Sequence, residues 1–294
     1  MIDEAKIPEE VRNSFNEILN RHGYSFQYGA LKLVFDLFDQ TQSEWLFEAV
    51  EFPVCVQGAT TRIDFILRHK RCSTFYLLVE CKRANPALSN WCFVRAPIIR
   101  RNRSHEPLFL EQAKCRFEKN MLQGADKPIE AFAPKGGQTL NNAYHIALEV
   151  KSSKTGDKVS TGRGTIEDAA SQICRGVSGF IEFLSRNTQI LGEKDRAYFL
   201  PVIFTTAQIW SSDVDLNSAD VVSGNVNFSK SECKNEPWIA YQYHVSPGLK
   251  HSCSPDERPN TIGQIMELEY VRTIPIVNSS GIETFLRWSS NLFD

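Results

Sequence analysis

The sequence predicts an α/β fold in which helices flank a mixed β-sheet. Three observations indicate it: helical periodicity near both ends of the chain and at 165–187, three β-rich segments within residues 45–82, and one strongly apolar segment at 197–210. Strands joined by short turns run antiparallel, whereas a strand reached through a helix can return parallel to its neighbour. We therefore expect a core in the order helix, three strands, helix, strand.

Two helices are expected before the first strand. In residues 7–21, Val11, Phe15 and Ile18 recur at the three- and four-residue spacing of a helix. Residues 25–39 repeat this spacing with a more apolar composition, which indicates a second helix.

Three strands are expected next. Residues 45–56 are rich in β-forming side chains, and the turn Gln57-Gly58-Ala59 separates them from a strand at 62–67. A basic turn then leads into a strand at 74–82. These short connections predict an antiparallel meander.

Residues 83–142 have a different character and are interpreted as an insertion. They contain several prolines, a helix-like stretch at 107–122 and a basic cluster at 95–103. Such a cluster suits a loop that grips backbone phosphates, and it equally suits a solvated loop.

The core is expected to resume with a strand at 144–152. The helix at 165–187 has an amphipathic pattern, with Thr165 as its N-cap and Asp168 as the acid of a capping box. The segment at 197–210 is apolar enough for a central strand that is buried on both faces.

A C-terminal extension is expected over about residues 211–294. After a polar stretch it contains probable strands at 238–245 and 267–277 and a short helix at 280–293. We treat residues 1–294 as a single domain, with the insertion at about 83–142.

The composition restricts the class of protein. Apolar residues make up 42% and charged residues 23% of the chain, as in an ordinary globular protein. The formal net charge of -2 excludes an overall basic character, so any nucleic-acid surface must be local. No apolar run approaches the roughly 18–20 residues that cross a bilayer, and the N-terminal segment is too polar for a secretory signal. We expect a soluble cytoplasmic protein with reduced cysteines and no membrane contact.

The hairpin at 60–86 carries three charged residues in otherwise apolar strands. With a turn centred near Cys72, the numbers of paired residues sum to about 144, so Asp64 falls opposite Glu80. Lys82 lies two residues after Glu80 and therefore on the same face. We expect these three side chains to converge near the end of the strands.

This convergence favours a metal site. Two neighbouring carboxylates repel each other unless positive charge lies between them. The lysine supplies part of that charge, and Mg²⁺, which is usually held by one or two carboxylates and a substrate phosphate, would supply more. The alternative is a strand end and an ion pair on a solvated face. The apolar flanks, together with the cationic residues Lys70, Arg71 and Arg83, favour the metal site.

The segment RIDFIL…YLLVECKR resembles the PD-(D/E)xK nuclease superfamily, which has a restriction-endonuclease-like αβββαβ core, over about residues 25–210. By this resemblance Asp64 is the acid of the second strand, and Glu80-Cys81-Lys82 is the E-x-K of the third. Ile63 stands where the family usually has proline.

The resemblance also implies roles for these residues. Asp64, Glu80 and the carbonyl of Cys81 would hold the metal. Lys82 would position or activate water, and Gln172 on the following helix would face the site.

The superfamily's activity is metal-dependent hydrolysis of phosphodiester bonds, usually in DNA. The resemblance therefore implies a Mg²⁺-dependent endonuclease, with Mn²⁺ as a substitute, that acts on DNA in a prokaryotic defence or restriction setting. A partner subunit or a homodimer is compatible with it. The alternative is a catalytically silent nuclease-fold subunit that binds nucleic acid or a protein partner, and the intact triad argues against this alternative.

A second E-x-K, Glu149–Lys151, directly precedes the helix that carries Gln172. It is the weaker candidate because the nearest upstream acids, Asp126 and Glu130, lie in a segment without strand character.

Three further residues are assigned structural roles. Glu48 and Glu51 precede the hairpin and are expected on a solvated strand face; the alternative, implied by the resemblance, is an additional upstream acid of the site. Trp91 could stack on a base, but a place in the core or a lid is expected.

Overall fold

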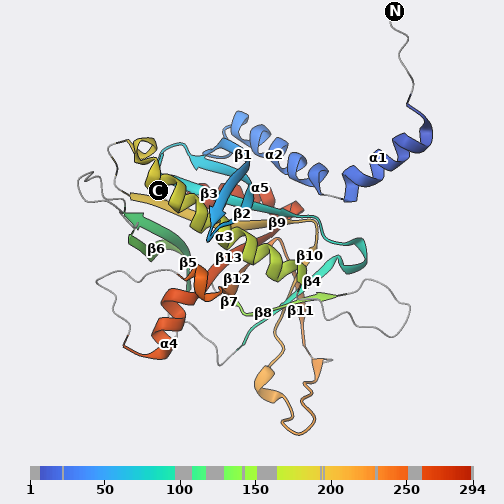
Figure 1. The fold of residues 1–294 in the computed structure, drawn as a ribbon. Coiled ribbons are helices and arrows are strands. Elements are labelled where there is room, and N and C mark those ends of the chain that lie inside the picture. Colours follow the sequence, from blue (N-terminus) through green and yellow to red (C-terminus); the bar gives the residue numbers. More distant parts are fainter. Residues whose placement is uncertain are drawn as a thin grey trace, which may run out of the picture.

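The computed structural model describes residues 7–21, 23–96, 108–116, 129–140, 143–150, 164–192, 194, 196–228, 231–250 and 260–292. Within them the fold is α/β, with a mixed sheet between helices, as the sequence predicts (Figure 1). No helix in these ranges is long and apolar enough to cross a membrane.

The main sheet has the strand order β1 (Trp45–Val56), β2 (Ala59–His69), β3 (Phe75–Lys82), β9 (Arg196–Thr205), β13 (Val271–Asn278), β12 (Trp238–His244) and β7 (Ala143–Tyr144). The first three strands form the predicted antiparallel meander, and β9 pairs parallel with β3. β9 is buried on both faces over nearly its whole length, which confirms the predicted central strand.

Helices cover both faces of this sheet. α2 (Tyr24–Asp39) and α5 (Ile282–Ser290) pack on one face, and α3 (Gly164–Arg186) packs on the other. α1 (Glu9–Arg21) extends away from the body beyond the start of α2 (Figure 1). We call the apolar layers on the two faces the α2-face core and the α3-face core. The α2-face core includes Phe65, Leu77, Val79 and Phe285, and the α3-face core includes Ile66, Leu78, Ile173 and Phe180.

A second, smaller sheet has the order β11 (Cys233–Glu236), β10 (Gln208–Ser212), β4 (Asn90–Val94) and β8 (Ile146–Val150). The apolar segment predicted as one strand at 197–210 is divided between the two sheets, since β9 ends at Thr205 and β10 begins three residues later at Gln208. Trp91 of β4 is fully buried, which confirms its expected place in the core.

The expectation of a helix at 107–122 is wrong. Its described part is strand β5 (Leu108–Arg116), which pairs with β6 (Ile129–Leu140) and with the first half of β9. Pairing with an exposed sheet edge outweighs the weak helical pattern, because strand formation depends on neighbouring strands more than on intrinsic propensity. The interpreted insertion therefore contributes strands to both sheets, and its basic cluster after Ala96 lies outside the described residues.

The C-terminal strands are integral to the main sheet. β13 pairs parallel with the second half of β9 and antiparallel with β12. The predicted strand at 267–277 begins only at Val271, because Met266–Tyr270 forms a π-helical turn.

α3 packs closely on β1 through a glycine. A Cβ atom on Gly179 would lie 2.6 Å from the Cβ of Val54, whereas a Cβ on Gly29 of α2 would meet nothing within 4 Å. The two helical glycines thus offer a matched test of this packing.

We expect Gly179→Ala to destabilise the protein by about 1–3 kcal/mol, because α3 must move off β1 to admit the methyl group. Gly29→Ala should stabilise it by about 0.5–1 kcal/mol, since alanine restricts the unfolded chain and meets open space. Urea unfolding of both variants measures the difference. Equal effects would show that α3 and β1 are not in close contact.

Candidate functional site

The site lies where the pairing of β2 with β3 ends. Phe65 is opposite Val79 and Ile66 is opposite Leu78, which confirms the predicted register. At the next position the carboxylate of Asp64 accepts a hydrogen bond of 2.6 Å from the backbone N–H of Cys81. A side chain here takes the role of a main-chain acceptor, and this fixes the orientation of the carboxylate between the two strands.

The regular alternation of side chains is interrupted at the same level of the sheet. Val50 and Phe65 pack on the α2-face core, whereas Phe52 and Ile63 pack on the α3-face core, although residues two apart in a strand normally share a face. Between them Glu51 has a φ of 50°, a left-handed conformation that is uncommon for residues other than glycine.

The predicted side chains of the site come together. The ammonium group of Lys82 lies 2.7 Å from Oε1 of Glu80 and donates a 3.1 Å hydrogen bond to Oε1 of Gln172 on α3. They line one open pocket of about 340 Å³. Its lining residues are Gly23, Tyr24, Gln27, Glu51, Arg62, Asp64, Glu80, Cys81, Lys82 and Gln172.

Cys81 contributes to the pocket through its main chain. Its thiol packs against the α2-face core, and burial raises the pKa of the thiol well above its usual value. The thiol is therefore not a nucleophile of this site.

Both carboxyl groups are held in an environment that disfavours their charge. Burial raises the pKa of Asp64 from 3.8 to about 6, and its hydrogen bond with Cys81 opposes the rise. Burial and the neighbouring charge of Asp64 raise the pKa of Glu80 from 4.5 to about 8, against the opposing effect of Lys82. Only 1% of Glu80 is exposed. The single positive charge of Lys82 is therefore too little to balance both carboxylates at neutral pH.

The donor set fits a hard divalent cation. Oε2 of Glu80 is buried without a hydrogen-bond partner, so one carboxylate oxygen still needs a ligand. The described residues contain no group of three His, Cys, Asp or Glu side chains that could enclose a metal. A cation held by two carboxylates, main chain and water or phosphate matches Mg²⁺ rather than Zn²⁺.

Two further residues belong to this site: Gln27 escaped the sequence analysis, whereas Glu51 was expected on a solvated strand face, with an additional acid of the site as the alternative. The carboxylate of Glu51 lines the pocket, with 31% of the side chain exposed, and accepts a 2.7 Å hydrogen bond from Gln27. The same amide nitrogen of Gln27 donates to the carbonyl of Asp64 at 3.1 Å. A buried glutamine on α2 thus bridges the strands where their alternation is interrupted. A lone glutamine within an apolar helix was the available signal. Glu48 matches its expected solvated role, since it pairs with Arg68 at 2.8 Å.

The rival E-x-K is not part of this pocket. The carboxylate of Glu149 accepts hydrogen bonds from the backbone N–H groups of Thr165 and Ile166, at 2.6 and 3.1 Å. It therefore caps α3, and the expected cap by Thr165 is wrong: the hydroxyl of Thr165 donates to Glu149. Lys151 lies outside the described residues.

The expected cationic surroundings are only partly present. Lys70 and Arg71 lie in the turn of the hairpin, six residues from Asp64, which is about 20 Å along the strand. They face Phe38 and Glu44 instead. Arg83 is nearer, and its guanidinium donates to the carbonyl of Asn20. Arg62 lines the pocket itself.

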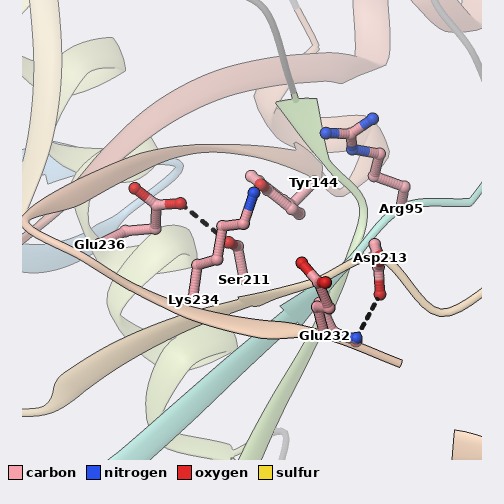
Figure 2. A pocket seen from close by; sticks show the side chains of 8 residues that line it. Arg95, Tyr144, Ser211, Asp213, Glu232, Lys234 and Glu236 are labelled. Atoms are coloured by element: carbon pink, nitrogen blue, oxygen red, sulfur yellow. Dashed lines mark hydrogen bonds between the residues drawn. The ribbon is translucent and has the colours of Figure 1, made fainter. Parts of the chain in front are cut away.

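A second pocket of about 110 Å³ lies beside the smaller sheet (Figure 2). Its cations are Lys234 and Arg95, and the guanidinium of Arg95 lies over the ring of Tyr144 at 5.7 Å. The hydroxyl of Ser211 donates to Glu236 at 2.9 Å, and the carboxylate of Asp213 accepts a 2.7 Å hydrogen bond from the backbone N–H of Glu232. Among the residues that line this pocket, no buried side-chain atom lacks a hydrogen-bond partner, so it offers less chemistry than the carboxylate pocket.

Comparisons with family models, curated proteins and solved structures give no match for this chain. The geometry of the site carries the functional argument.

Metal-free protein should lose stability as pH rises from about 4.5 to 8. Asp64 and Glu80 keep their protons in the folded state above the pH at which the unfolded chain releases them, so folding becomes less favourable as pH rises through this range. Mn²⁺ should reverse the loss at high pH, by about 2.7 kcal/mol at 100 times its Kd. Thermal unfolding at pH 5.5 and 8, with and without Mn²⁺, measures this. Glu80→Gln should flatten the pH dependence; an unchanged slope would contradict the raised pKa.

Replacing Gln27 should lower both the stability of the protein and its affinity for the metal, because Gln27 holds Glu51 and the main chain of Asp64 in place. Gln27→Leu leaves the carboxylate of Glu51 and the carbonyl of Asp64 without their donor, and we expect a loss of about 1–3 kcal/mol together with weaker Mn²⁺ binding. The exposed Gln189→Leu is the control and should change stability by less than about 0.5 kcal/mol. Urea unfolding and calorimetric Mn²⁺ titration give both quantities. Unaltered Mn²⁺ affinity in Gln27→Leu would refute a positioning role.

Proposed function

We propose that this chain is a metal-dependent nuclease that hydrolyses phosphodiester bonds, with DNA as its expected substrate. The observation that carries the proposal is the meeting of Asp64, Glu80 and Lys82 in one pocket, with a buried carboxylate oxygen that has no partner. The resemblance to PD-(D/E)xK nucleases supports the same function and suggests a defence or restriction setting.

Asp64 and Glu80 are the residues that would hold Mg²⁺ or Mn²⁺, with the carbonyl of Cys81 as the main-chain ligand implied by the resemblance. When bound, the cation supplies a Lewis acid that shields the negative charge of the phosphate and acidifies water. The cost of placing two carboxylates in a buried site is then offset by their ligand.

Lys82 is the residue that would orient the attacking water molecule. Its bonds to Glu80 and Gln172 hold the ammonium group at the wall of the pocket, where it can orient a water molecule and neutralise charge on the phosphate. In hydrolysis the water gives up a proton as its oxygen bonds to phosphorus, the bond from phosphorus to the sugar oxygen breaks, and that sugar oxygen takes up a proton. Gln172 positions Lys82 from α3 and does not itself react.

The test is cleavage of supercoiled plasmid and labelled oligonucleotides with Mg²⁺, Mn²⁺ or EDTA. Activity should require the metal, and Glu80→Gln and Asp64→Asn should abolish it. Lys82→Ala should lower the rate about 100-fold or more. Glu149→Gln, which alters the cap of α3 but not the pocket, should keep most of the activity.

Folding controls accompany this test. Glu80→Gln removes a disfavoured buried charge, so it should unfold at a higher temperature than the wild type at pH 8 without metal. Inactivity of the wild type with every substrate, alongside normal folding, would favour the silent subunit that binds nucleic acid or a partner. Equal activity of wild type and Lys82→Ala would refute the role given to the lysine.

A further inference from the structure

Exposed aromatic side chains form a line along α2 that begins at the carboxylate pocket. Tyr24 lines the pocket and is 49% exposed, and Tyr28, one helical turn further on, is 56% exposed. Phe35 is 46% exposed and its ring lies 5.4 Å from that of Phe47 on β1. We call Tyr24, Tyr28 and Phe35 the aromatic strip.

Helix geometry places the three residues on one side of α2. At 100° per residue, Tyr28 and Phe35 lie about 40° and 20° around the axis from Tyr24. The buried side of the helix, which includes Gln27 and Val34, faces the sheet instead. The strip is about 16 Å long at 1.5 Å per residue. With a rise of about 3.4 Å per stacked nucleotide, it can accommodate four or five.

Cationic side chains flank the strip and the pocket from which it starts. Arg62 lines the pocket, with 66% of its side chain exposed, and its contact with Glu51 is long, at 3.4 Å. Lys32, one turn after Tyr28, is 75% exposed in a pair with Asp36. Exposed pairs of this kind contribute little stability, so Lys32 can exchange its partner for a phosphate.

We propose that the aromatic strip binds a single-stranded nucleic acid, whose unpaired bases stack on Tyr24 and Tyr28 while its backbone enters the carboxylate pocket. In a duplex the base faces are already stacked on each other, so exposed aromatic rings beside the site can stack only with unpaired bases. Glu80 at the bottom of the pocket also requires a phosphate to enter from the surface. This inference rests on the proposed function, because it assigns the class of substrate for that site.

Binding can be measured separately from cleavage. Fluorescence anisotropy in EDTA compares three labelled probes: oligothymidine, a hairpin duplex, and an abasic strand with the same number of phosphates. The wild type should bind oligothymidine more tightly than either of the others. Tyr24→Ala and Tyr28→Ala should each weaken oligothymidine binding about 5- to 100-fold and leave abasic-strand binding nearly unchanged. Tyr24→Phe and Tyr28→Phe should stay within about twofold of the wild type, since the ring is retained.

Phe15→Ala on α1 is the matched control, because Phe15 is an equally exposed aromatic residue away from the strip, and it should not alter binding. Equal binding of oligothymidine and the abasic strand, or no effect of the alanine variants, would overturn the proposal. Self-association that is lost in Tyr28→Ala would also overturn it, by making the strip a contact between copies. Metal-dependent cleavage that does not depend on the tyrosines would support the nuclease proposal and refute the aromatic strip. Tyrosine-dependent binding without cleavage would support the aromatic strip and refute the nuclease proposal.

Discussion

The hydrogen bond from the Cys81 N–H to the Asp64 carboxylate determines the arrangement of this site. Two antiparallel strands normally satisfy each other through main-chain groups, and this pair does so up to Phe65 and Val79. At the next step a carboxylate replaces the carbonyl acceptor. The strand pair can then end while a charged side chain remains held within hydrogen-bonding distance of β3. The position of Glu80 and Lys82 on β3 follows from the same register.

This arrangement has an electrostatic cost that the rest of the pocket only partly offsets. Lys82 neutralises one oxygen of Glu80, and Gln27 donates to the neighbouring Glu51. The other oxygen of Glu80, Oε2, has no hydrogen-bond partner, and the pKa values of both acids are raised above their usual range. A protein that kept such groups only for stability would gain from replacing them with apolar residues of similar size. Their presence is better explained by a ligand that completes the site.

The parts of the structure that were predictable from sequence are those set by short-range geometry. A tight turn fixed the register of β2 and β3, so the meeting of Asp64 with Glu80 followed from residue numbers alone. The place of Gln172 facing the site was implied by the family resemblance, and its amide oxygen does accept a hydrogen bond from Lys82. The errors have a common cause, which is dependence on distant partners. β5 is a strand because β6 and β9 offer edges, and Glu51 reaches the pocket because its φ of 50° interrupts the alternation of β1. The role of Gln27 could not be assigned from sequence, because nothing in the sequence shows that α2 covers the part of β1 and β2 that contains Glu51 and Asp64.

The cap that Glu149 provides for α3 has a consequence for how the helix is held. Two backbone N–H groups at the start of the helix are bonded to a carboxylate at the end of β8, so the helix is anchored directly to the smaller sheet. α3 is therefore held at its first turn by a side chain of β8 and along its length by packing on the main sheet. With two separate attachments, the placement of Gln172 beside Lys82 does not depend on the helix cap alone, and a weakened cap need not reach the carboxylate pocket.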